Sequence, residues 1–327
     1  MSKKRIFSGA QPTGRLHLGN YLGALKNWVE LQDEYDSIFC IVNLHALTLP
    51  QDPKTLRKST LDLARVYLAA GIDPSKAVIF LQSDVPAHAE LTWVLLCTAR
   101  MGELERMTQF KDKAKGNTER AGVGLFSYPV LMASDILLYQ TNLVPVGHDQ
   151  KQHLELTRDL AERFNRDFGE TFTIPEVFIP KAGARIRSLQ DPAKKMSKSD
   201  ENEAGAIFLD DGADAIAKKI KRAVTDSGTE ISFDESRPAI HNLLTIYQLV
   251  TGKSEQECVD NFAGKGYGQF KAELADAVIE YLRPFQEQIA SFDDASVAKI
   301  LQDGAEKARS IASETLADAY AKLGIVT

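Results

Sequence analysis

The first half of the chain alternates short apolar segments with amphipathic helical segments, and this alternation limits the possible folds more than any other feature. Each apolar segment is almost continuously apolar, as expected of strands that are buried on both faces of a sheet. The alternation predicts an α/β fold in which helices cover a parallel sheet. The predicted strands are residues 5–8, 37–43, 77–82 and 142–146.

Helical segments fill the intervals between these strands. The clearest has Asp52 as its N-cap and Pro53 at its first position, and it ends at Gly71. From about residue 205 the β pattern stops and helical segments follow one another. They are predicted at 213–225, 238–251, 254–262, 270–291 and 294–322.

These patterns predict two domains. Residues 1–204 are expected to form a Rossmann-like, doubly wound parallel sheet that carries the binding sites, and residues 205–327 an α-helical domain. With 327 residues, 44% of them apolar, the chain can bury a large core.

Cysteine usage and hydropathy indicate a cytoplasmic protein. Cys40, Cys97 and Cys258 are odd in number and far apart, which argues against a disulfide framework and against a thiolate metal site. No run of about twenty apolar residues occurs, so we expect no membrane segment. The net charge of −6 gives no overall reason to expect a nucleic-acid partner, although residues 181–200 are locally basic.

Two loops stand out against this background. The first, Gly9–Asn20, follows the first predicted strand and contains His17-Leu-Gly19-Asn20 at the start of a helix, where free N–H groups attract phosphate. The second is Lys194-Lys-Met-Ser-Lys-Ser199, whose ammonium groups suit a triphosphate that gains charge during reaction. Taken alone, the first could be an ordinary strand-to-helix turn and the second a solvated surface loop.

Together the two loops resemble the paired signature of the class I aminoacyl-tRNA synthetases, and the wider sequence is similar to the bacterial-type tryptophanyl family of that class. Asn20 replaces the final histidine of the first motif, and His148 stands where relatives often carry an acidic residue. Other nucleotide fingerprints fail, because Tyr247 replaces the first glycine of a P-loop ending at Ser254. Further blocks of resemblance are 7–14, 19–25, 102–111, 128–139 and 144–153.

The resemblance implies an ATP-dependent ligase that forms tryptophanyl-adenylate and transfers tryptophan to tRNA(Trp). It implies Mg²⁺ on the ATP phosphates, no metal ligated by the protein, and a homodimer whose helical half holds the anticodon. The residues implied in catalysis are Lys195, Lys198 and Lys113. Those implied in ATP binding are Gln11, Pro12, Thr13, Gly19, Asn20, Gly147, His148, Asp149, Ile186, Lys195, Met196, Ser197, Lys198 and Ser199.

A tryptophan pocket needs one buried acceptor, because the indole N–H is a donor and never an acceptor. Asp135 lies in an apolar helical segment, where a carboxylate requires a partner, and the resemblance gives it the indole nitrogen. The alternative is a carboxylate on a solvent-exposed helix face. The other predicted tryptophan-binding residues are Phe7, Met132, Tyr128, His45 and Gln150; Val42, Val144 and Val146 are predicted either to enclose the ring or to be plain core.

Two alternatives remain at this point. A tyrosyl enzyme of the same class would need both an acceptor and a donor for the phenol group, and it normally has phenylalanine and glycine in its lysine-serine loop. A non-catalytic tRNA-binding paralogue would be expected to lack part of the nucleotide motifs, and both motifs are present.

Overall fold

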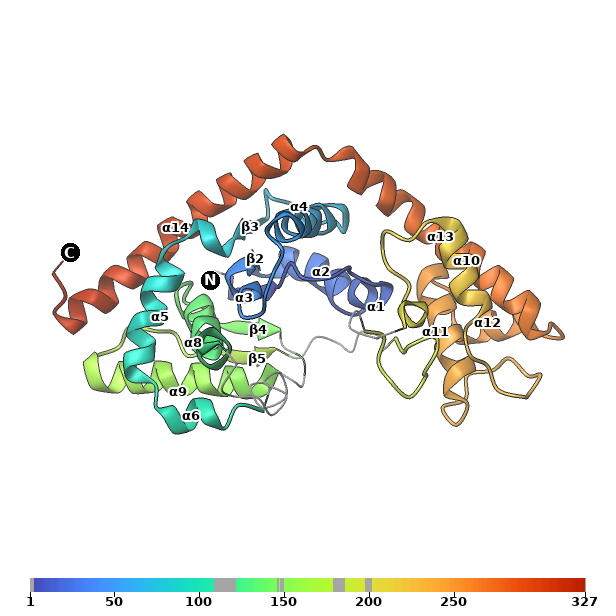
Figure 1. Cartoon of the computed structure of the whole chain (residues 1–327), viewed down its shortest axis with the longest axis horizontal. Helices are drawn as coiled ribbons and strands as arrows, with labels where there is room; N and C mark the ends of the chain where they lie inside the picture. Colours follow the sequence, from blue (N-terminus) through green and yellow to red (C-terminus); the bar gives the residue numbers. More distant parts are fainter. Residues whose placement is uncertain are drawn as a thin grey trace.

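The sheet has five parallel strands in the order β3-β2-β1-β4-β5 (Figure 1). The computed structural model describes residues 3–108, 122–145, 147, 150–178, 186–197 and 202–326. The four predicted strands are confirmed, and a fifth at the edge of the sheet is added. The strands are β1 (Arg5–Ala10), β2 (Asp36–Ile41), β3 (Ala77–Leu81), β4 (Leu143–Pro145) and β5 (Glu176–Phe178).

Alternate residues of each strand enter different cores, because successive side chains of a strand point to opposite faces. Ile6 belongs to one cluster of buried side chains, and its neighbour Phe7 belongs to the other. In β2, Phe39 belongs to the first cluster and its neighbour Cys40 to the second. Both faces of the sheet are therefore covered, which confirms the doubly wound α/β fold.

Helices fill the intervals between the strands as predicted. Asp52 caps α4 by accepting from the Thr55 N–H at 2.8 Å, and Gly71 follows its end with a φ of +103°. The first-half elements are α1 (Leu18–Asn20), the π-helical turn η1 (Tyr21–Leu25), α2 (Lys26–Glu34), α3 (Asn43–Ala46), α4 (Pro53–Ala69), η2 (Gln82–Asp84), α5 (Ala87–Thr98), α6 (Met101–Glu105), α8 (Val123–Leu137) and α9 (Lys151–Phe168).

The second half of the described chain is helical, as predicted. A 3₁₀ turn, η5 (Glu203–Gly205), leads into α10 (Ala213–Lys221), α11 (Pro238–Thr251), α12 (Glu255–Phe262), α13 (Tyr267–Ser291) and α14 (Asp294–Leu323). The P-loop-like residues have structural roles here: Gly252 ends α11 in the left-handed region, and Ser254 caps α12.

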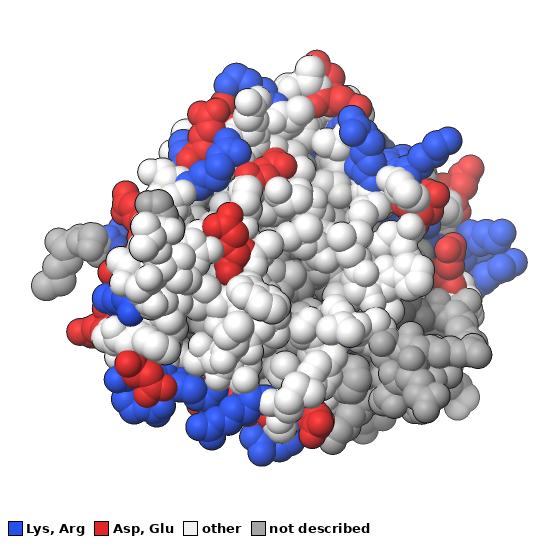
Figure 2. Space-filling model, turned by 60° about the vertical axis from the view of Figure 1, so that its left-hand side comes forward, with Lys and Arg blue, Asp and Glu red and all other residues white. Residues whose placement is uncertain are grey.

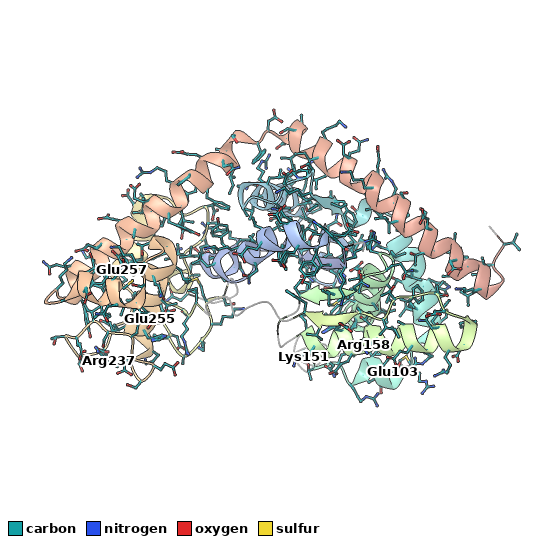
Figure 3. The ribbon with its side chains drawn as sticks, turned by 180° about the vertical axis from the view of Figure 1, so that it is seen from behind. Glu103, Lys151, Arg158, Arg237, Glu255 and Glu257 are labelled. Atoms are coloured by element: carbon teal, nitrogen blue, oxygen red, sulfur yellow. The ribbon has the colours of Figure 1, made fainter. Side chains whose placement is uncertain are left out.

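Two long helices connect the two halves. In Figure 1, α13 rises from the helical group on the right, and α14 descends across the sheet side toward α5. Seen from behind in Figure 3, Arg237, Glu255 and Glu257 mark the helical group, and Glu103, Lys151 and Arg158 mark α6 and α9 on the opposite side. Ala305, Ala308 and Ala312 of α14 lie in the same buried cluster as Phe7. None of the described helices is both long and apolar enough to cross a membrane.

Candidate active site

A pocket of about 360 Å³ opens at the carboxyl ends of β1 and β4. The sheet order places the topological switch point between these strands, which is where open α/β sheets bind their ligands. The pocket is lined by Phe7, Ser8, Gly9, Gln11, Val42, His45, Tyr128, Met132, Asp135, Ile136, Val144, Pro145, Gly147 and Gln150.

One face of α8 forms a wall of this pocket. Tyr128, Met132, Asp135 and Ile136 recur at the spacing of a helix face, so the helix presents them together. Tyr128 is fixed at its outer end, because its hydroxyl lies 2.8 Å from His153 Nε2. Burial raises the pKa of Tyr128 to about 12, so it remains a phenol at neutral pH.

Asp135 is the acidic residue of the pocket wall and is only 1% exposed, which excludes a solvated helix-face carboxylate. Its Oδ2 lies 2.7 Å from His45 Nε2, and its Oδ1 lies 2.6 Å from both Gln82 Nε2 and His88 Nδ1. Burial alone would raise the pKa of Asp135, but its interactions with His45 and His88 outweigh burial and hold the pKa well below its usual range. The pocket therefore contains a buried carboxylate that acts only as an acceptor.

The glycine-containing first loop forms a capped helix start beside the pocket. Asn20 N–H donates to His17 Nδ1 at 3.2 Å, and His17 N–H donates back to Asn20 Oδ1 at 3.1 Å. Gly19 allows close packing here, because a Cβ at this position would lie 3.1 Å from His17 Nδ1, and it would also contact Ile186 Cβ at 3.4 Å. The structure thus brings the first loop against a residue that precedes the lysine-serine loop.

The described part of the lysine-serine loop is held by its methionine. Met196 is buried, and its N–H donates to the Ile186 carbonyl oxygen at 3.0 Å. Lys195 is exposed, and its backbone forms an antiparallel bridge with Arg187. The buried Met196 therefore anchors this segment, while the neighbouring Lys195 extends into solvent.

Eight of the predicted site residues line this one pocket. All six predicted tryptophan-binding residues line the pocket, together with Gln11 and Gly147 from the ATP set. Val42 and Val144 line it as well, whereas Ile186 and Met196 are core residues that position the loops. Pro12 is buried, and Thr13 is half-buried. Lys113, Val146, His148, Asp149, Lys198 and Ser199 lie outside the described residues.

Reasoning from the sequence missed the residues behind Asp135. Gln82 and His88 are fully buried and contact its carboxylate, and Tyr139 contacts His88 in turn. The one signal for them was the requirement that a carboxylate in an apolar helix have partners, which the structure confirms. Ser8, Gly9, Ile136 and Pro145 also line the pocket and were not predicted.

Comparison with known proteins agrees with this arrangement. Residues 2–283 match the family described as tRNA synthetases class I (W and Y). The chain therefore belongs to the class I tRNA synthetase family whose members act with tryptophan and tyrosine.

Within this family the chain is similar over its whole length to tryptophan–tRNA ligases. It is 55% identical over 326 residues to the Helicobacter pylori tryptophan–tRNA ligase, with 100% of both chains covered. The structure matches the Campylobacter jejuni tryptophanyl-tRNA synthetase complexed with ADP and tryptophan, with a TM-score of 0.88, 40% identity and coverage of 98% and 99%. The Mycoplasma pneumoniae enzyme matches with a TM-score of 0.88 at 39% identity, covering 99% and 98%.

Proposed function

We propose that this chain is a tryptophan–tRNA ligase, which activates L-tryptophan with ATP and transfers it to the 3′ end of tRNA(Trp). The observation that carries this function is the identity of 55% with a tryptophan–tRNA ligase across the full length of both chains. The pocket agrees with it, because an apolar wall around one acceptor-only carboxylate suits a ring whose only polar group is a donor.

In the proposed reaction, the tryptophan carboxylate attacks the α-phosphorus of ATP in line, and pyrophosphate leaves. The terminal ribose hydroxyl of tRNA then attacks the carbonyl carbon of tryptophanyl-adenylate and releases AMP. Neither step needs a protein nucleophile, so catalysis comes from positioning and from stabilising charge on the phosphate oxygens. We assign that stabilisation to Lys195, with Lys198 and Lys113.

We propose that Asp135 accepts a hydrogen bond from the indole N–H and that Phe7 and Met132 pack against the ring. Tyr128 and Gln150 are assigned to the ammonium group of the substrate, and His45 to a contact beside Asp135. Each of these residues lines the same pocket, which supports the assignment. The similar structure from Campylobacter jejuni is a complex with ADP and tryptophan, which supports a site for each kind of ligand in this chain.

We propose that ATP binds to the first loop, the Gly147–Asp149 segment and the lysine-serine loop. Mg²⁺ would neutralise part of the phosphate charge and would be held by the phosphate oxygens of ATP. The described residues contain no cluster of three or more His, Cys, Asp or Glu side chains that could hold a metal ion.

We also propose separate roles for the two halves of the chain. We assign ATP and tryptophan to residues 1–204 and the tRNA anticodon to residues 205–327. Exposed Lys218, Lys221 and Arg222 at the end of α10 give the helical part positive charge suited to a phosphate backbone. A cytoplasmic location, where ATP and tRNA occur, is part of the same proposal.

The proposed assembly is a homodimer. Trp93 on α5 is 70% exposed, Met101 on α6 is 65% exposed, and Val123 at the start of α8 is 79% exposed. Figure 2, which brings the side of the molecule with these helices forward, shows a broad face with few charged side chains. Large exposed apolar side chains on adjoining helices mark an interaction surface, and we assign it to a second copy of this chain.

The proposed function is tested by charging tRNA(Trp) transcript with labelled tryptophan in the presence of ATP and Mg²⁺. We expect tryptophan to become acid-precipitable with tRNA(Trp) and not with tRNA(Tyr). No charging by the folded chain, or charging of tRNA(Tyr) with tyrosine, would overturn the proposal.

A further inference from the structure

Asp135 is surrounded by groups that can only donate to it. Gln82 and His88 both reach Oδ1, at 2.6 Å, and neither residue lines the pocket. His45, which does line the pocket, reaches Oδ2 at 2.7 Å. A carboxylate oxygen can accept two hydrogen bonds. Gln82 and His88 therefore fill Oδ1, whereas the described residues leave one acceptor position on Oδ2.

The orientation of the Gln82 donor is set by a second contact. Its Oε1 accepts from the Leu44 N–H at 3.0 Å, so its amide group can present only N–H to Asp135. The side chain of Gln82 therefore cannot flip to offer an acceptor without losing both bonds.

Tyr139 sets the orientation of His88 in the same way. The Tyr139 hydroxyl lies 2.7 Å from His88 Nε2, and that nitrogen is the one hydrogen-bond partner that the described residues offer it. Burial raises the pKa of Tyr139, so its hydroxyl stays protonated and forms its hydrogen bond with His88 Nε2 as a neutral phenol. Because a carboxylate oxygen only accepts, His88 Nδ1 carries a proton that points at Asp135 Oδ1.

We propose that His88 is a positioning residue. It holds the Asp135 carboxylate so that only Oδ2 can accept a hydrogen bond from the substrate, and it thereby selects an aromatic amino acid with a ring N–H. The proposal rests on the proposed function and extends it to a residue that does not touch the substrate. The N–H groups of Gln82, His88 and His45 that point at Asp135 are all bonded to its carboxylate. A phenol oxygen, which needs a donor, therefore finds none there, whereas one ring N–H can fill the remaining acceptor position of Oδ2.

His88 is held firmly enough for this role. Its carbonyl oxygen accepts from Ser134 Oγ at 2.8 Å, which ties α5 to the helix that carries Asp135. The ring of Tyr139 also stacks on Phe7, with centroids 5.6 Å apart and 10° between the ring planes. The same tyrosine thus supports the apolar wall of the pocket and the hydrogen-bond chain that ends at Asp135.

The test is ATP–pyrophosphate exchange with tryptophan and with benzothienylalanine, in which sulfur replaces the ring N–H. The readout is the ratio of kcat/KM for the two substrates. His88→Leu removes the donor to Asp135, and we expect the preference for tryptophan to fall roughly ten- to a hundred-fold, the loss typical of a charge-assisted hydrogen bond. His88→Asn keeps an N–H near the position of Nδ1 and should restore most of the preference.

Thr92→Val is the matched control. Thr92 lies one turn further along α5, and its hydroxyl donates to the His88 carbonyl oxygen at 2.6 Å, so its loss should leave the ratio unchanged.

If His88→Leu does not fold, Tyr139→Phe provides the test, because it removes the hydroxyl and keeps the ring. The preference for tryptophan should then fall several-fold. A His88→Leu or Tyr139→Phe enzyme that is slower with both substrates by the same factor would overturn the proposal. Absence of tryptophan-dependent exchange in the unmodified chain would instead overturn the proposed function.

Discussion

Gly304 of α14 lies directly against the backbone of Ile79 in β3. A Cβ at position 304 would lie 1.9 Å from the Ile79 carbonyl oxygen and 2.8 Å from its carbonyl carbon. Because neither atom belongs to a flexible side chain, any residue larger than glycine must push the helix away from the sheet. The glycine therefore lets the last helix lie on the edge strand of the sheet.

Gly304→Ala should destabilise the protein by up to about 2 kcal/mol, because overpacking a well-packed interface costs about 1–3 kcal/mol. This cost outweighs the gain of roughly 1 kcal/mol that alanine normally brings to a helix interior. Gly268→Ala in α13 is the control, because a Cβ there meets no atom within 4 Å and should be neutral or slightly stabilising. Urea unfolding of both variants measures the difference, and equal stability of the two would show that α14 does not pack as described.

Asp135→Ala should cost on the order of 2–4 kcal/mol in tryptophan activation, because it removes a charged acceptor and leaves a donor unpaired. ATP binding should barely change. The loss should be much smaller for an analogue without the ring N–H, since that analogue makes no such bond. Exchange measured for both substrates with both proteins gives the coupling energy, and a value near zero would show that Asp135 does not read the indole nitrogen.

Lys195→Ala should lower the rate of adenylate formation on the order of a hundred-fold, while the binding of tryptophan stays nearly unchanged, because the phosphate oxygens gain charge only during transfer. Lys194→Ala is a suitable comparison: its ammonium group lies 3.0 Å from Asp191 Oδ2, and we expect a smaller effect. Single-turnover kinetics and equilibrium binding separate the two quantities. Lys198→Ala, which alters a residue outside the described ranges, should behave like Lys195→Ala.

Trp93→Glu should shift the protein from dimer to monomer, because it places a charge within the exposed apolar surface of α5. Light scattering should report twice the 36.1 kDa mass for the unmodified chain and a lower mass for the variant. Val224→Glu is the control: Val224 is an exposed apolar residue, 43% accessible, that follows α10. A monomeric unmodified chain, or equal loss of dimer in both variants, would contradict the proposed interface.

Hydrophobic periodicity was sufficient to predict most of the fold. Buried strands such as Ala77–Leu81 are apolar throughout, and caps such as Asp52 and Ser254 mark helix starts with side-chain chemistry that is visible in the sequence. β5 was missed because Glu176 and Val177 are exposed at the sheet edge and form no apolar run. The route of α14 was also missed, since an alanine-rich face does not reveal whether it packs on a helix or on a strand.

The site was predictable where its residues follow strand ends or known motifs, as Gln11 and Gly147 do. His88 and Gln82 were not, because their contact with Asp135 depends on how α5 and η2 pack against α8, and no local pattern encodes that packing. The contact between Gly19 and Ile186 joins segments that lie far apart in the chain for the same reason.

The most direct measurement is ATP–pyrophosphate exchange by the purified chain with each of the twenty amino acids in turn. If the pocket around Asp135 reads a ring N–H, exchange should depend on tryptophan and should be at least about 10⁴-fold weaker with tyrosine or phenylalanine, the discrimination typical of a site with a buried polar partner. Exchange that responds equally to tyrosine, or no exchange with any amino acid, would contradict the assignment of this chain as a tryptophan–tRNA ligase.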